Sequence, residues 1–152
     1  MTAINHALTG AVIGLVVGQP LLALPMAVVS HYVCDALPHF GLRMSNKLKL
    51  KTNGFRNYLI VEAALCFLLV VMLAVLHPAN WLLAAECAFL AAAPDFLSIN
   101  RYLTTRAGKH WKPGLYSKFA GGIQWFERPI GAVVEVAWLI AAIIVMAPFL
   151  VR

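Results

Sequence analysis

Charged residues are scarce in this chain. They make up 12% of its 152 residues, whereas hydrophobic residues make up 62% and the mean hydropathy is +0.82. An average soluble domain is roughly a quarter charged. The composition therefore excludes an ordinary soluble domain. It predicts an integral membrane protein, because the chain has room for several spans of about 20 apolar residues each.

Cysteine is also rare, and no two cysteines form a CxxC pair. Cys34, Cys66 and Cys87 all lie in apolar runs, which is typical of small buried hydrophobic residues and argues against a disulfide framework or a thiolate metal site. The first residues carry no basic leader, so we expect no cleavable signal peptide.

Turn residues and basic segments divide the apolar sequence into runs that predict one all-α domain, a polytopic bundle of about five transmembrane helices. The expected helices cover residues 2–17, 21–37, 57–76, 81–93 and 129–150, and the expected basic loops cover 41–56 and 98–128. All Lys and Arg residues except Arg152 lie in those two loops. The positive-inside rule therefore places both loops and the N-terminus in the cytoplasm.

Small residues follow one face of the first expected helix. His6, Gly10, Gly14 and Gly18 recur every four residues. Such spacing lets helix backbones approach closely in a bilayer, where the hydrophobic effect does not drive helices together. We therefore expect His6 to lie on a packed face and not to contact lipid.

Acidic residues are few, but most of them lie where a charge is costly. Of the six, only Glu127 lies outside the apolar runs and their ends. A charge at the bilayer centre costs about 2.5–3.5 kcal/mol. Cations, hydrogen bonds or protonation must therefore offset the burial of the other five.

The segment 30–39 suggests which groups offset the burial of these acidic residues. His31 and Asp35 stand four residues apart, so a helix puts them on one face, and Pro38 ends that helix just before His39. In the five-span arrangement further imidazoles and carboxylates reach the same cytoplasmic depth. The predicted metal ligands are His6, His31, Asp35, His39, Asp95 and Glu135.

Imidazole and carboxylate ligands favour a divalent metal, zinc first, with manganese or iron as alternatives. Asp95 and Glu62 are the candidate general bases. Glu62 and Glu135 fit equally well as outer partners that orient a metal-binding histidine.

Three segments, 5–10, 30–40 and 93–95, resemble the YdjM-like predicted membrane-bound metal-dependent hydrolases, a LexA-regulated inner-membrane group. That family is distantly similar to zinc-dependent phospholipase C and P1-type nucleases. The resemblance implies a bacterial inner-membrane location and metal ligands at His6, His31 and Asp35. Segment 123–129 is similar to a stretch found in these related proteins. By that resemblance, a histidine is expected shortly before the stretch. Here the preceding positions hold Phe119, Ala120 and Gly121.

These observations favour a metal-dependent hydrolase that acts on a lipid or other phosphoester at the cytoplasmic leaflet, with membrane lipids as its surroundings. Arg101, Lys118 and Arg128 are the candidate phosphate-binding residues.

The alternative is a non-catalytic membrane protein with a structural metal, which the missing histidine favours. An ion or proton transporter ranks third. Nucleic-acid binding is not expected, because the basic loops are short, and the sequence makes no prediction of oligomeric state.

Overall fold

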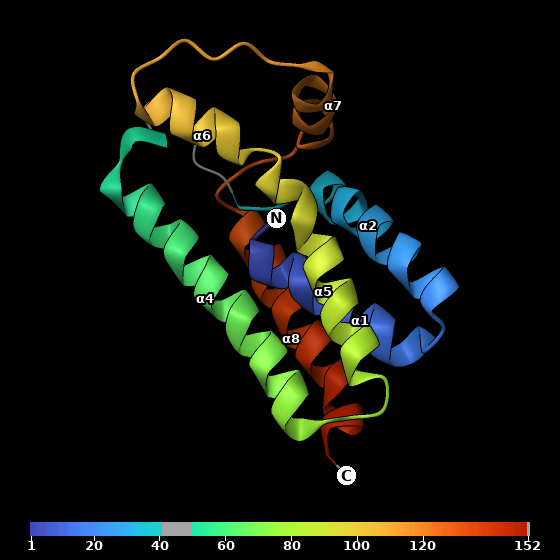
Figure 1. Cartoon of the computed structure of the whole chain (residues 1–152). Helices are drawn as coiled ribbons and strands as arrows, with labels where there is room; N and C mark the ends of the chain where they lie inside the picture. The colour runs from blue at the N-terminus through green and yellow to red at the C-terminus, as the bar shows by residue number, and fades with distance from the viewer. Residues whose placement is uncertain (41–49, 152) are drawn as a thin grey trace.

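The computed structural model describes residues 1–40 and 50–151, and among these no strand forms. One isolated parallel bridge joins His39 to Glu127. The helices, in chain order, are α1 (Ala3–Val17), α2 (Pro20–Ala36), α4 (Asn53–Leu76), α5 (Trp81–Phe96), α6 (Ile99–Arg106), α7 (Leu115–Ile123) and α8 (Gly131–Leu150) (Figure 1). The predicted all-α class is confirmed.

Within residues 1–40 and 50–151, three helices are long and apolar enough to cross a membrane: Asn53–Leu76, Gly131–Leu150, and Trp81–Arg106, which takes in α5 and α6. The α1 and α2 helices are apolar but shorter, with 15 and 17 residues. Large apolar side chains of α4 and α8 are exposed, which suits contact with acyl chains. The fold therefore fits a membrane protein.

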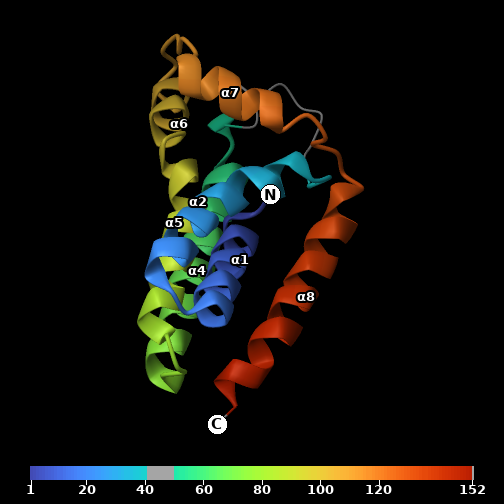
Figure 2. The ribbon, with the colours of Figure 1, turned by 90° about the vertical axis from the view of Figure 1, so that its right-hand side faces the viewer.

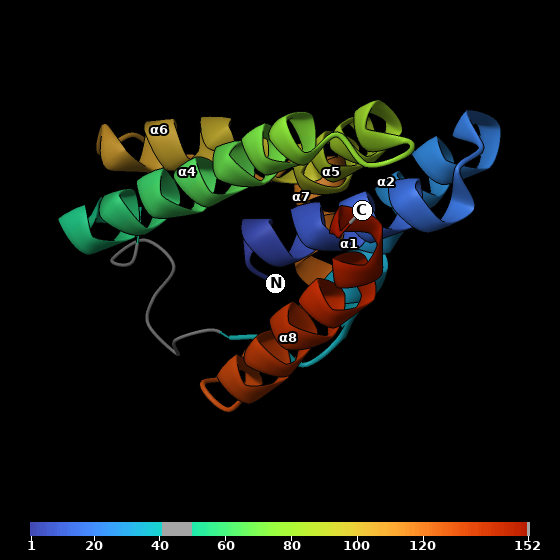
Figure 3. The ribbon, with the colours of Figure 1, turned by 90° about the horizontal axis from the view of Figure 1, so that it is seen from below.

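The α1 helix occupies the centre of the bundle. It contacts α2, α4, α5 and α8, and it lies between the α4–α5 pair and α8 (Figures 2 and 3). Figure 1 shows α6 and α7 gathered at the end of the bundle where the N-terminus lies, opposite the C-terminus. A helix surrounded in this way buries its polar side chains among protein and not in lipid.

Close backbone contact between α1 and α5 confirms the predicted small-residue face. A Cβ atom added to Gly10 would lie 2.2 Å from the Cys87 carbonyl oxygen, and one added to Gly14 would lie 2.4 Å from Ala84 Cα. The next residue of the stripe, Gly18, adopts φ 64° and ends α1 in a left-handed conformation that glycine favours.

Two helix boundaries differ from the sequence prediction by three residues or more. The α4 helix begins at Asn53 and not at residue 57, because the Thr52 hydroxyl caps it by accepting a 3.1 Å hydrogen bond from the Phe55 N–H. The α5 helix continues past residue 93 to Phe96, since Pro94 sits in its last turn, where the missing N–H removes a single helical hydrogen bond.

The segment 98–128 was predicted as a loop, but it contains α6 and α7. Side chains four residues apart stabilise α6: the Thr104 hydroxyl donates to Asn100 Oδ1 at 3.2 Å, and the Arg106 guanidinium donates to the Tyr102 hydroxyl at 3.0 Å. The other predicted basic loop, 41–56, lies at residues 41–49 outside the described part of the chain.

Candidate metal centre

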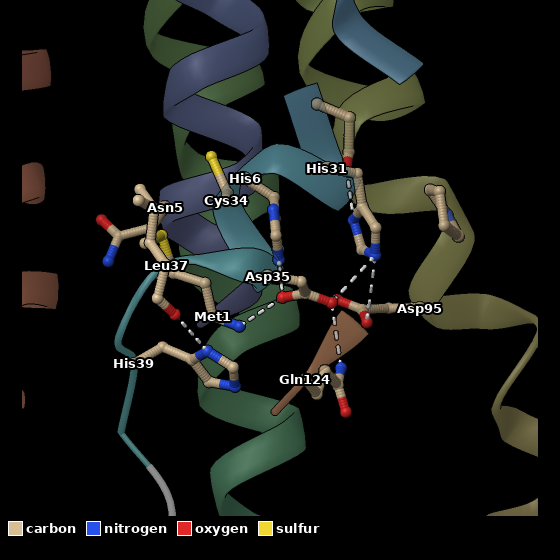
Figure 4. A network of polar contacts seen from close by, with 12 residues as sticks. Met1, Asn5, His6, His31, Cys34, Asp35, Leu37, His39, Asp95 and Gln124 are labelled. Carbon is tan, nitrogen blue, oxygen red and sulfur yellow. Dashed lines mark hydrogen bonds and ion pairs between the residues drawn. The ribbon is translucent and has the colours of Figure 1, made fainter. Parts of the chain in front are cut away.

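Three helices bring imidazole and carboxylate groups together at the end of the bundle that carries α6 and α7. One ligand atom each from His6 on α1, His31 on α2 and Asp95 on α5 lie within 4.8 Å of one another. Asp35, one turn beyond His31 on α2, lies beside them (Figure 4). Pro38 ends α2 as predicted, because Leu37 takes the extended conformation required before proline.

The separations between these groups suit a shared cation. His6 Nε2 lies 3.1 Å from Asp35 Oδ1, His31 Nε2 lies 3.5 Å from Asp35 Oδ2, and the same nitrogen lies 3.9 Å from Asp95 Oδ1 (Figure 4). Two ligands bound to a tetrahedral zinc ion at about 2.0–2.2 Å lie roughly 3.3–3.5 Å apart. His6, His31 and Asp95 could therefore hold a metal ion, with Asp35 beside them.

The histidines are oriented as metal ligands require. His31 Nδ1 lies 2.8 Å from the Ala91 carbonyl oxygen, which can only accept, so Nδ1 donates this hydrogen bond and Nε2 faces the carboxylates. The rings of His6 and His31 stack with their centroids 4.1 Å apart.

Charge balance points to a cation in the same place. His6, His31 and Asp35 are buried, and His6 Nδ1 has no hydrogen-bond partner among the residues described. The Asp35 and Asp95 carboxylates face this group, and the amino group of Met1 lies 2.5 Å from Asp35 Oδ1. A cation beside Asp95 would give that carboxylate a positive partner of its own.

Gln124 is a site residue that the sequence analysis did not select. It follows the last residue of α7, and its amide Nε2 donates a 2.9 Å hydrogen bond to Asp35 Oδ2 (Figure 4). The resemblance pointed to segment 123–129 but to a histidine before it. The structure instead places Phe119 against Tyr32, with ring centroids 5.5 Å apart, and brings Gln124 to the carboxylate.

We expect Gln124→Leu to weaken metal binding by roughly 10–100-fold, because an outer-shell partner that fixes a ligand has effects of that size. Metal titration monitored by competition with a chromogenic chelator would measure the change. The chain's other glutamine, Gln19, is exposed before α2, so Gln19→Leu is the matched control. Equal affinities in the two variants would contradict a role for Gln124.

Three other predicted residues lie outside this group. His39 Nδ1 lies 2.9 Å from the Leu37 carbonyl oxygen, Glu135 Oε1 accepts a 3.1 Å hydrogen bond from the Phe40 N–H, and Glu62 Oε2 accepts a 2.9 Å hydrogen bond from the Ile4 N–H. All three are buried. The two glutamates therefore hold backbone segments next to His39 and His6, which suits the outer-partner role more than direct coordination.

The group opens on one side into a cavity of about 400 Å³. Asp95, Arg101, Gln124 and Glu127 contribute its polar lining, and the Asp95 side chain is 43% exposed. The Arg101 guanidinium lies 5.3 Å from the ring centroid of Trp111. The other two candidate phosphate-binding residues, Lys118 and Arg128, are exposed and do not line this cavity. Their phosphate-binding role stays a prediction.

One hydrogen bond ties α7 to α5 beside this site. The Tyr116 hydroxyl donates to the Pro94 carbonyl oxygen at 3.0 Å. Burial, together with a hydrogen bond to Tyr32, raises the pKa of Tyr116, so the phenol stays protonated and keeps donating at neutral pH. This contact holds α7 next to the residue that precedes Asp95.

The chain matches no known protein family, no curated protein and no solved structure. Fold and site together define an all-helical protein with three helices able to cross a membrane and a buried His/Asp group that could hold a metal ion.

Proposed function

We propose that the protein is an integral membrane hydrolase that cleaves phosphoesters with a divalent metal, zinc first, held by His6, His31, Asp35 and Asp95. The observation that carries this proposal is the cavity at Asp95. A structural metal site is closed, whereas a catalytic site keeps an open position. Here the ligand group meets a polar cavity of about 400 Å³ that an arginine also lines.

Each residue has a distinct task in this proposal. His6, His31, Asp35 and Asp95 would hold the divalent ion, which would supply Lewis-acid chemistry by lowering the pKa of water to about 7 and polarising a phosphoryl oxygen. The Ala91 carbonyl orients His31, and Gln124 fixes Asp35. Arg101 neutralises phosphoryl oxygens in the cavity.

Asp95 is the better placed of the two predicted general bases, because Glu62 is engaged by the Ile4 N–H. In this proposal Asp95 faces the metal through the oxygen nearest His31 and uses its second carboxylate oxygen as the base, since its side chain is 43% exposed. Hydrolysis joins the water oxygen to phosphorus and breaks the phosphorus–oxygen bond to the leaving group. The proton that Asp95 accepts from water then returns to the departing oxygen.

The proposal includes five spans with the N-terminus in the cytoplasm of a bacterial cell, in its inner membrane. The short α1–α2 hairpin supplies the two spans beyond the three long helices. The N-terminus and the basic residues of α6 and α7 share one end of the bundle (Figure 1). Under the positive-inside rule, this arrangement puts the His/Asp group at the cytoplasmic leaflet.

Hydrolysis of methyl p-nitrophenyl phosphate by the zinc-loaded, purified protein tests the proposal. We expect Asp95→Asn to lower kcat per bound metal ion by about 10²–10⁴-fold, the usual contribution of a general base. Arg101→Gln should lower kcat/KM by about 10–100-fold, since hydrogen bonds to charged groups contribute about 1.5–3 kcal/mol. Lys112→Gln, at an exposed position outside the cavity, is the control. A wild-type protein that binds one metal ion and releases p-nitrophenolate neither from this ester nor from its dodecyl counterpart would disprove the proposal.

A structural metal is the second candidate, and the burial of His6, His31 and Asp35 supports it. In that case the ion would stabilise the α1–α2 hairpin and no substrate would reach it. Cobalt substitution separates the two candidates. A visible spectrum that inorganic phosphate leaves unchanged would favour the structural ion, whereas a shifted spectrum would favour the open site.

A further inference from the structure

A second cavity is also lined by Asp95 of the candidate metal centre. It has a volume of about 310 Å³ and is lined by residues of α1, α4 and α5. Asp95 and Leu59 line both this cavity and the one that contains Arg101. Asp95, in the hydrolytic site of the proposed function, therefore faces both cavities.

The second cavity is apolar. Apart from Asp95 and Glu62, its lining consists of Ala, Val, Leu, Phe and Cys side chains. Two of these, Phe67 and Phe89, are 67% and 60% exposed on helices that are able to cross a membrane. The cavity is therefore a groove that is accessible from the surface that acyl chains would cover, and we call it the α1–α4–α5 groove.

The cavity that contains Arg101 adjoins a basic cavity. A third cavity, of about 350 Å³, shares Arg101 and Leu50 with the central one and is also lined by Lys51, Lys109 and His110. The three cavities form a series in which Arg101 links the basic cavity to the central one and Asp95 links the central one to the groove. The series runs from a basic end to an apolar end.

We propose that the substrate is a lipid phosphoester whose hydrocarbon chain occupies the α1–α4–α5 groove while its phosphate lies between Asp95 and Arg101. This inference rests on the proposed hydrolytic function and names its substrate class. The apolar groove accepts the chain, and the basic cavity attracts an anionic headgroup. A small water-soluble phosphoester would leave the groove empty.

Two alanines of α4 provide a matched pair of variants. Ala63 is exposed and lines the groove, whereas the adjacent Ala64 is exposed and does not line it. A tryptophan at position 63 would fill the groove from an exposed position, so it need not disturb the buried core. A tryptophan at position 64 adds the same side chain to the same helix outside the groove.

Kinetics in amphipol compare dodecyl p-nitrophenyl phosphate, below its aggregation concentration, with the methyl ester. Each methylene that leaves water raises binding roughly fourfold, so kcat/KM of the wild type should favour the dodecyl ester by at least about 100-fold. Ala63→Trp should reduce this preference at least about tenfold, with turnover of the methyl ester and metal content unchanged. Ala64→Trp should retain it. Equal preference in the two variants would overturn the inference.

A binding measurement separates this inference from the proposed function. Dodecyl phosphate with a terminal diazirine is photolysed on the protein, and the labelled peptides are identified by mass spectrometry. Label on the groove segments of α4 and α5 that Ala63→Trp removes and Ala64→Trp preserves supports the groove even without hydrolysis. Label of equal strength in both variants refutes it. Hydrolysis of neither ester, with metal bound, refutes the proposed function alone.

Discussion

His31→Ala should strip the divalent metal from the protein. The Nε2 atom of His31 lies 3.5 Å from one carboxylate of the group and 3.9 Å from the other, so it is the imidazole that faces both. Its removal also leaves Asp35 and Asp95 facing each other with fewer positive or polar partners. We expect affinity to fall by more than the roughly 10–100-fold that loss of an outer-shell partner costs.

Asp35→Ala should have an effect of the same order, because Asp35 contacts both imidazoles. Elemental analysis of the detergent-purified variants, beside the wild type, measures the metal bound per chain. His77→Asn is the control: His77 is exposed in the turn before α5, and asparagine tolerates its left-handed φ of 47°. Full metal content in both His31→Ala and Asp35→Ala, with a monodisperse elution profile, would rule out the candidate centre.

Local sequence signals predicted the part of the site that a single helix creates. The four-residue spacing of His31 and Asp35 puts them on one face of α2, and Pro38 sets where that helix ends. The stripe of small residues in α1 likewise predicted a packed face that includes His6. These features depend only on helical periodicity and on the stereochemistry of proline and glycine, which the sequence states directly.

Depth alone does not define a ligand set. His39 and Glu135 were predicted as ligands because the five-span arrangement gives them the same depth as His31. A ligand must also point toward the ion, and rotation of a helix about its axis sets that direction. Glu135 points to the Phe40 amide, and His39 pairs with the Leu37 carbonyl oxygen. No sequence spacing fixes such rotations between helices.

Gln124 lies beyond the reach of sequence reasoning for a related reason. It is 89 residues from Asp35, and it reaches the carboxylate only because α7 lies over the end of α2. The segment that contains α7 was treated as a loop because its basic and aromatic residues lack a long apolar run. The pairs at a spacing of four, such as Tyr102 with Arg106, were the available sign that α6 forms a helix.

Gly10→Ala should disrupt the bundle and the metal centre together. The added Cβ would lie 2.2 Å from the Cys87 carbonyl oxygen and 2.8 Å from Ala91 Cβ. Carbonyl groups of a helix cannot swing aside as a flexible side chain can, so α1 must move away from α5. Overpacking typically costs about 1–3 kcal/mol and more where backbone must shift.

The displacement should reach the metal ligands because of where the contact lies. Gly10 is one turn from His6 on α1, and the Ala91 carbonyl that orients His31 belongs to the residue that Gly10 touches on α5. Thermal unfolding in detergent and metal content should therefore fall together in Gly10→Ala. Gly54→Ala, in α4 with open space around the added Cβ, should leave both unchanged. A Gly10→Ala protein that melts and binds metal like Gly54→Ala would show that the α1–α5 contact does not position the imidazoles.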